Sequence, residues 1–91
     1  MSIQWLFDVI EDRKHNPTEK SYTASLFKEG LPRIAQKVGE EGTEVVVAAL
    51  AQDDQRLIEE VADLTYHTLV LLSARGLSPA RVVAELEKRH Q

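Results

Sequence analysis

The chain contains no cysteine among its 91 residues, which excludes disulfides, zinc–thiolate sites and cysteine nucleophiles. Aromatic side chains are few, and seven glycine and proline residues in all favour a helical globule over a β-sandwich or disorder. Positive charge is also scarce: 11 Lys and Arg against 15 Asp and Glu argue against a sequence-independent nucleic-acid binder. No apolar run approaches the roughly 18 residues of a membrane span, and no basic stretch precedes an apolar one at the N-terminus. We therefore expect a cytoplasmic protein without membrane association.

The length is that of one small domain, which we expect to span 1–91, because two domains need a longer chain. A chain of this size buries only about 60–65% of the surface that it exposes when unfolded. A core formed by one copy alone is therefore marginal.

Turn-forming residues divide the chain into segments whose apolar residues recur every three or four positions, as in amphipathic helices. Thr23 is a suitable N-cap for a short second helix, and Gly30 can end that helix in the left-handed conformation. Pro32 suits the first turn of a longer helix, and Asp53 or Asp54 can cap the helix after it. No segment has the alternation of a strand, so the predicted fold class is all-α. We expect helices over about 2–14, 24–29, 32–51, 54–75 and 79–89.

Two acidic pairs stand out in the third and fourth predicted helices: Glu41 with Glu44, and Glu60 with Asp63. Residues three apart lie on one face of a helix. The tight link around Gln52 predicts an antiparallel helical hairpin. In that register Glu44 lies level with Glu60, and Glu41 lies level with Asp63. Each pair also borders the apolar stripe of its helix, so the four carboxylates are expected to converge at the edge of the helix–helix seam.

Such a cluster needs positive charge, because each pair of carboxylates about 6 Å apart repels by roughly 3 kcal/mol at an effective dielectric constant of 20. Lys37 supplies one nearby positive charge, which cannot balance four acids. Carboxylate oxygens favour hard divalent cations, so the sequence predicts a site for Mg²⁺, with Mn²⁺ as an alternative. A single pair of this kind is usually a solvated surface, whereas two matched pairs favour the metal site.

The residues around these pairs resemble a known family. The stretch 37–44, Lys-Val-Gly-Glu-Glu-Gly-Thr-Glu, followed after 15 residues by Glu60-Val-Ala-Asp63, resembles the Glu-x-x-Glu…Glu-x-x-Asp signature of the all-α nucleoside-triphosphate pyrophosphohydrolases, the MazG-like superfamily. The segment 21–30, Ser-Tyr-Thr-Ala-Ser-Leu-Phe-Lys-Glu-Gly, is similar more specifically to the phosphoribosyl-ATP pyrophosphohydrolases of histidine biosynthesis. The resemblance covers nearly the whole chain and is weakest over 11–20.

This resemblance implies hydrolysis of the α–β phosphoanhydride of 1-(5-phosphoribosyl)-ATP to phosphoribosyl-AMP and pyrophosphate, with Mg²⁺ held by the four acids of the two pairs. Such chemistry needs a positioned water and neutralised phosphate oxygens. Glu40 and Glu59 lie outside the matched levels and are candidates for the base that activates the water. Lys37 is a candidate catalytic cation beside the acids.

Other residues are candidates for binding the substrate. Lys28 and Lys37 are expected to bind the triphosphate, with Arg33 a weaker candidate. His67 lies level with Lys37 and one turn beyond the acids; a contact with the substrate or a hydrogen bond to a metal ligand is open to it, and a structural role is favoured. Helical spacing favours a place in the core for Trp5 and Phe7. Tyr22 is expected to bind the substrate. The aromatic side chains available to stack on an adenine are Trp5, Phe7, Tyr22 and Phe27.

Two other functions fit the same acids. One is a housekeeping pyrophosphatase that acts on non-standard nucleoside triphosphates with the same metal site. The other is a non-catalytic helical module whose acidic seam binds a cation or docks a basic partner. Only the segment 21–30 favours phosphoribosyl-ATP over these alternatives.

The apolar surface of the hairpin helices is wider than one neighbour can cover. Val46, Val47 and Leu50 point away from the stripe that faces the other hairpin helix. The apolar arc of the next helix is widened by Ile58, Ala62 and Leu69. We therefore predict that two hairpins pair about a two-fold axis into a four-helix core, in a homodimer or a dimer of dimers. The second chain is expected to complete each substrate pocket.

Overall fold

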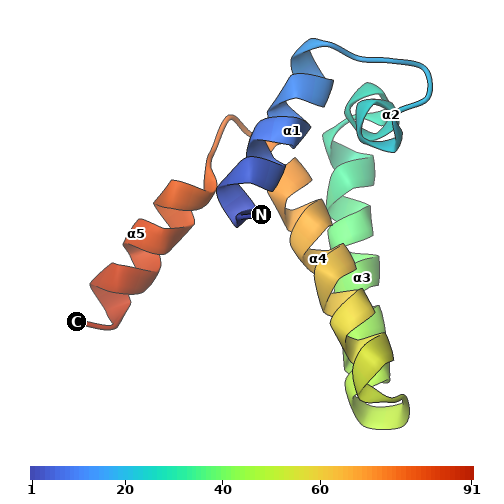
Figure 1. Cartoon of the computed structure of the whole chain (residues 1–91), viewed down its shortest axis with the longest axis vertical. Helices are drawn as coiled ribbons and strands as arrows, with labels where there is room; N and C mark the ends of the chain where they lie inside the picture. The colour runs from blue at the N-terminus through green and yellow to red at the C-terminus, as the bar shows by residue number, and fades with distance from the viewer.

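The computed structural model describes all residues 1–91 and contains no strand, which confirms the all-α prediction. Figure 1 shows α3 and α4 as a long antiparallel hairpin, with α1 and α2 at its open end and α5 extending away from it. No helix combines the length and the apolar character needed to cross a membrane. The five helices are α1 (Ile3–His15), α2 (Tyr22–Glu29), α3 (Leu31–Ala51), α4 (Asp54–Ala74) and α5 (Pro79–Arg89).

Capping side chains start α1, α2 and α4, and the start of α2 differs from the prediction by two residues. Asp53 caps α4 by accepting the backbone N–H of Arg56 at 2.9 Å. The predicted cap Thr23 is wrong, because the hydroxyl of Ser21 accepts the N–H of Ala24 at 3.1 Å and starts α2 two residues earlier. Gly30, with φ +98°, is the only residue between α2 and α3 and ends one helix where the next begins.

The core lies at the open end of the hairpin, where α1 and α2 pack against α4 and α3. Phe7 is buried there as predicted, whereas Trp5 is exposed and the prediction that it joins the core is wrong. Two residues apart on a helix point about 200° apart, so both cannot face the same core. The buried cluster consists of Phe7, Ile10, Leu26, Ile34, Leu69 and Val70.

Large apolar surfaces remain uncovered outside this core. The helix α5 buries no residue, and its main contact is with α1. Val82, Val83 and Leu86 leave an exposed apolar face along it. On the hairpin, Val46 and Leu50 are 56% and 84% exposed. One copy of the chain therefore leaves both α5 and the outer face of the hairpin without an apolar neighbour.

Candidate metal centre

Three carboxylates from the two hairpin helices meet in one cluster. Oxygen atoms of Glu41 on α3 and of Glu60 and Asp63 on α4 lie within 4.8 Å of one another. Glu41 and Glu60 are only 6% and 5% exposed, whereas Asp63 is open to solvent. The antiparallel register thus brings together three of the four acids that the sequence singled out.

The fourth acid, Glu44, borders this cluster from α3. A hydrogen bond with Glu60, together with the negative charges of Glu41 and Glu60, raises the pKa of Glu44 to about 7. A raised pKa of this kind indicates that the neighbouring carboxylates make the site strongly negative. The four acids therefore form one electrostatic unit, which we call the acidic cluster.

Two oxygen atoms in the acidic cluster have no hydrogen-bond partner. Glu41 Oε2 and Glu60 Oε2 are both buried and unpaired. A buried carboxylate oxygen without a partner is costly, and each can coordinate a cation. Oxygen-only donors on two facing helices suit Mg²⁺ or Mn²⁺ and not zinc, which takes nitrogen or sulfur ligands more often. The residues present therefore fit a hard divalent cation.

Lys37 balances part of this charge from α3. Its Nζ lies 3.3 Å from Glu41 Oε1 and 3.8 Å from Glu40 Oε2. Partial burial acts to lower the pKa of Lys37, but the hydrogen bond to Glu41 and the nearby Tyr22 and acids outweigh it, so the pKa is raised. Lys37 therefore stays charged and adjacent to the cluster, as a phosphate-binding cation must be.

Arg56 is a second cation that sequence reasoning missed. Its Nη2 donates to Glu60 Oε1 and its Nη1 to Glu59 Oε1, each at 2.5 Å. The sequence does indicate this contact, because Arg56 and Glu60 are four residues apart and such pairs are neighbours on a helix. Arg56, Glu44 and Glu60 also line a hollow of about 250 Å³ near the hairpin turn.

The two candidate bases lie outside the acidic cluster and have partners of their own. Glu40 accepts a hydrogen bond from Gln36 Nε2 at 2.7 Å and lies 3.7 Å from Arg33 Nη1. Arg33 also pairs with Glu29 at 3.6 Å, which holds it at the start of α3. Hydrogen bonds from Gln55 and then Arg56 lower the pKa of Glu59, which makes this carboxylate a weaker base than an ordinary glutamate.

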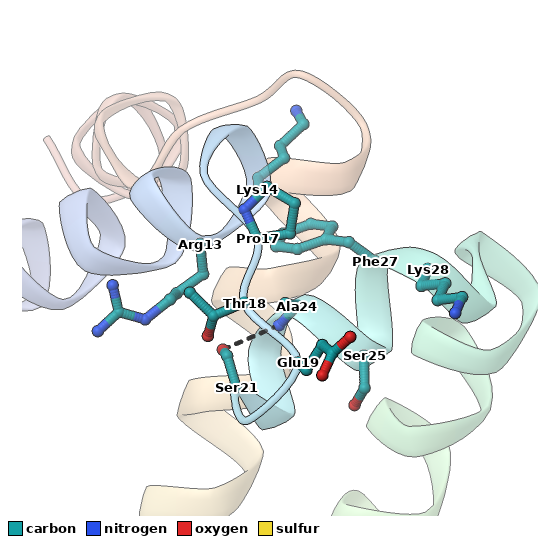
Figure 2. A pocket seen from close by; sticks show the side chains of 10 residues that line it. All are labelled: Arg13, Lys14, Pro17, Thr18, Glu19, Ser21, Ala24, Ser25, Phe27 and Lys28. Carbon is teal, nitrogen blue, oxygen red and sulfur yellow. Dashed lines mark hydrogen bonds between the residues drawn. The ribbon is translucent and has the colours of Figure 1, made fainter.

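Lys28 lines a different cavity, of about 740 Å³, between the end of α1, the loop after it and α2. Figure 2 shows that the cations around it diverge: Arg13 and Lys28 extend to opposite sides, and Lys14 points away from both. Lys14 is already bound, because its Nζ donates to the carbonyl oxygen of Ser73 at 2.7 Å. No member of the acidic cluster lines this cavity, so Lys28 is not brought together with the acids.

Tyr22 on α2 and His67 on α4 form a hydrogen-bonded pair one turn beyond Asp63. The hydroxyl of Tyr22 lies 3.1 Å from His67 Nε2, and Tyr22 is close enough to Lys37 to raise its pKa. His67 Nδ1 lies 2.7 Å from the backbone carbonyl of Asp63. Lys37 therefore contacts the acids directly, whereas Tyr22 is connected to them through His67, and the role of both in binding a substrate stays a prediction.

The chain is similar in sequence to known proteins. A family model described as phosphoribosyl-ATP pyrophosphohydrolase matches residues 4–90. The phosphoribosyl-ATP pyrophosphatase of Clostridium botulinum (strain Hall) is 48% identical over 89 residues, 98% of this chain and 81% of that protein. The phosphoribosyl-ATP pyrophosphatase of Lacticaseibacillus casei is 52% identical over 88 residues, 97% of this chain and 80% of that protein.

A longer relative contains a similar segment. The histidine biosynthesis bifunctional protein HisIE of Xylella fastidiosa is 51% identical over 83 residues, which are 91% of this chain and 40% of that protein. The family match and these identities cover nearly all of α1 to α5, including every member of the acidic cluster. The chain belongs to the phosphoribosyl-ATP pyrophosphohydrolase family.

Proposed function

We propose that this chain hydrolyses phosphoribosyl-ATP to phosphoribosyl-AMP and pyrophosphate in histidine biosynthesis, at a Mg²⁺ centre formed by the acidic cluster. Family membership supports the reaction, and it favours phosphoribosyl-ATP over the non-standard nucleotides and the non-catalytic module that the sequence left open. The observation that carries the metal centre is the pair of buried, unpartnered oxygens on Glu41 and Glu60. Glu44 and Asp63 supply the remaining carboxylates.

The residues around the acidic cluster have different proposed roles in the reaction. Bound Mg²⁺ would neutralise phosphate oxygens and polarise the anhydride. Lys37 stays protonated beside Glu41 and offers its ammonium to the departing pyrophosphate. Glu40 and Glu59 stay the candidates to take the proton of the attacking water, and hydrogen bonds from Gln55 and Arg56 weaken Glu59 as a base by lowering its pKa.

Pyrophosphate release separates this function from the alternatives. Purified protein is assayed with phosphoribosyl-ATP and with a panel of standard and non-standard nucleoside triphosphates, with and without Mg²⁺. The proposal predicts Mg²⁺-dependent release from phosphoribosyl-ATP at far higher kcat/KM than from any other nucleotide. A preference for a non-standard nucleotide supports the housekeeping enzyme, and no release from any compound supports the binding module.

We further propose that the active species is a homodimer whose hairpins pair into a four-helix core. The chain exposes 6374 Å², whereas a compact monomer of 10.3 kDa exposes about 5,400 Å². Its radius of gyration is 14.1 Å, against about 12 Å for a compact chain of this length. The excess of about 1,000 Å² is close to the roughly 800 Å² that one partner buries in a standard interface.

The glycines of α3 support the same assembly. A Cβ at Gly39 or Gly42 would meet nothing within 4 Å, although each glycine costs up to about 1 kcal/mol in a helix. They share the outer side of α3 with Val46 and Leu50, and the helix runs through them without a break. A close crossing by a second copy would use this flat surface, on the side of α3 that faces away from the acidic cluster.

A further inference from the structure

Tyr22 and Thr23 of α2 form hydrogen bonds with His67 and Tyr66 of α4, one turn beyond Asp63 of the acidic cluster. His67 is only 5% exposed, and both of its ring nitrogens have partners. The carbonyl oxygen of Asp63 can only accept, so Nδ1 carries the ring proton and donates it there. In the neutral ring, Nε2 is left as an acceptor, and the hydroxyl of Tyr22 donates to it at 3.1 Å.

The rings around His67 keep this geometry in place. His67 packs edge-on against Tyr66 and Tyr22, with ring centroids 5.0 and 5.9 Å away. Tyr22 and Tyr66 stack at 6.3 Å, and the hydroxyl of Tyr66 hydrogen-bonds to Thr23. Two hydroxyl contacts therefore tie the first turn of α2 to α4, one turn beyond the carboxylate of Asp63.

The network fixes what Tyr22 can offer to a ligand. A phenol has one proton, and once that proton is donated to His67 the oxygen presents only lone pairs. Tyr22 is 52% exposed, so these lone pairs are accessible, and its contact with His67, which in turn contacts the backbone of Asp63, connects it to the edge of the acidic cluster. Phosphate oxygens at neutral pH are acceptors, so Tyr22 is matched to a different part of a nucleotide.

We propose that His67 is a positioning residue that holds the Tyr22 hydroxyl as a hydrogen-bond acceptor for a donor of the nucleotide, either a ribose hydroxyl or the adenine amino group. The proposal rests on the proposed function, because it assumes that a nucleotide occupies the site beside the acids. In this arrangement Tyr22 recognises the nucleoside, and Lys37 and the metal bind the phosphates. A site that pairs with a donor rejects analogues that lack it.

Binding of nucleoside monophosphates tests this directly, because these probes contain no anhydride to cleave. Dissociation constants of the full-length protein with Mg²⁺ are measured by calorimetry for AMP, 2′-deoxy-AMP, 3′-deoxy-AMP and IMP. We expect one analogue, the one without the recognised donor, to bind up to about tenfold more weakly than AMP. The deoxy probes identify a ribose hydroxyl as the donor, and IMP identifies the amino group.

Tyr22→Phe should remove this preference, because it should weaken the binding of AMP until AMP binds no more tightly than that analogue. His67→Asn should have the same effect, and the double variant should be no worse than either single variant, because His67 acts through Tyr22. Tyr66→Phe is the matched control, since it removes the other hydroxyl contact of the same aromatic cluster and should keep the preference.

Three results would overturn the proposal: equal binding of all four probes by the unchanged protein, a preference that survives Tyr22→Phe, or additive losses in the double variant. His67 is buried, and if its variant fails to fold, the half-exposed Tyr22 variant still decides the acceptor role. The assay measures binding without turnover, so its failure is distinct from failure of the pyrophosphate-release assay.

Discussion

Replacing Leu50 by alanine tests the proposed dimer, and the structure sets the size of the effect. Leu50 lies on the outer face of the hairpin and is 84% exposed, so nearly all of its side chain is available for burial by a second copy. The substitution removes three carbons, worth about 2 kcal/mol per copy when buried at about 0.8 kcal/mol per carbon. A two-fold interface contains the residue twice, which gives about 4 kcal/mol and a dimer dissociation constant weaker by roughly 10³-fold.

Sedimentation velocity over a range of protein concentrations measures this constant for the unchanged chain and for Leu50→Ala. Leu31→Ala is the matched control, because it makes the same change at the opposite end of α3. The reasoning fails if the unchanged chain is a stable, active monomer at micromolar concentration. It also fails if Leu50→Ala dimerises as tightly as the control.

Three further predictions concern the acidic cluster and the lysines. Glu44→Gln or Asp63→Asn should abolish Mg²⁺-dependent turnover while the circular dichroism stays helical; near-normal activity would contradict the metal assignment. Lys37→Ala should lower kcat, because its ammonium is proposed to stabilise the departing pyrophosphate, whereas Lys28→Ala should at most raise KM, because Lys28 lines a separate cavity; unchanged kinetics would make either one a surface lysine. Because folding raises the pKa of Glu44 from 4.5 to about 7, the folded protein binds the extra proton, so metal-free stability should fall as pH rises between these values. Thermal unfolding at pH 5 and pH 8 measures this slope, and Glu44→Gln should flatten it.

The hairpin and its acids were predictable because regular helices have a fixed geometry. Once the turn at Gln52 is placed, the antiparallel register decides which residues lie level, and it brought Glu41, Glu60 and Asp63 together. Proline, glycine and aspartate at the helix ends set the other boundaries to within one or two residues. Local rules sufficed for these features because they depend on neighbours in sequence.

Features that depend on contacts across the fold were not predictable. Ser21 and Thr23 are both good N-caps, and only the path of the preceding loop decides that Ser21 starts α2. The bond between Tyr22 and His67 joins residues 45 positions apart, and it depends on the rotamers of both rings. Its residues were noticed in the sequence, but nothing in their spacing indicates that they meet.

The last helix has a consequence for how the chain can be observed. An isolated helix of 11 residues is shorter than the roughly 12–15 residues at which helices become marginally stable in water, and α5 buries nothing in the single chain. Its backbone amides should therefore exchange rapidly with solvent deuterium in dilute protein, long before those of α3 and α4. If a second copy covers Val82, Val83 and Leu86, protection of these amides rises with protein concentration, and the C-terminal helix becomes a built-in reporter of assembly.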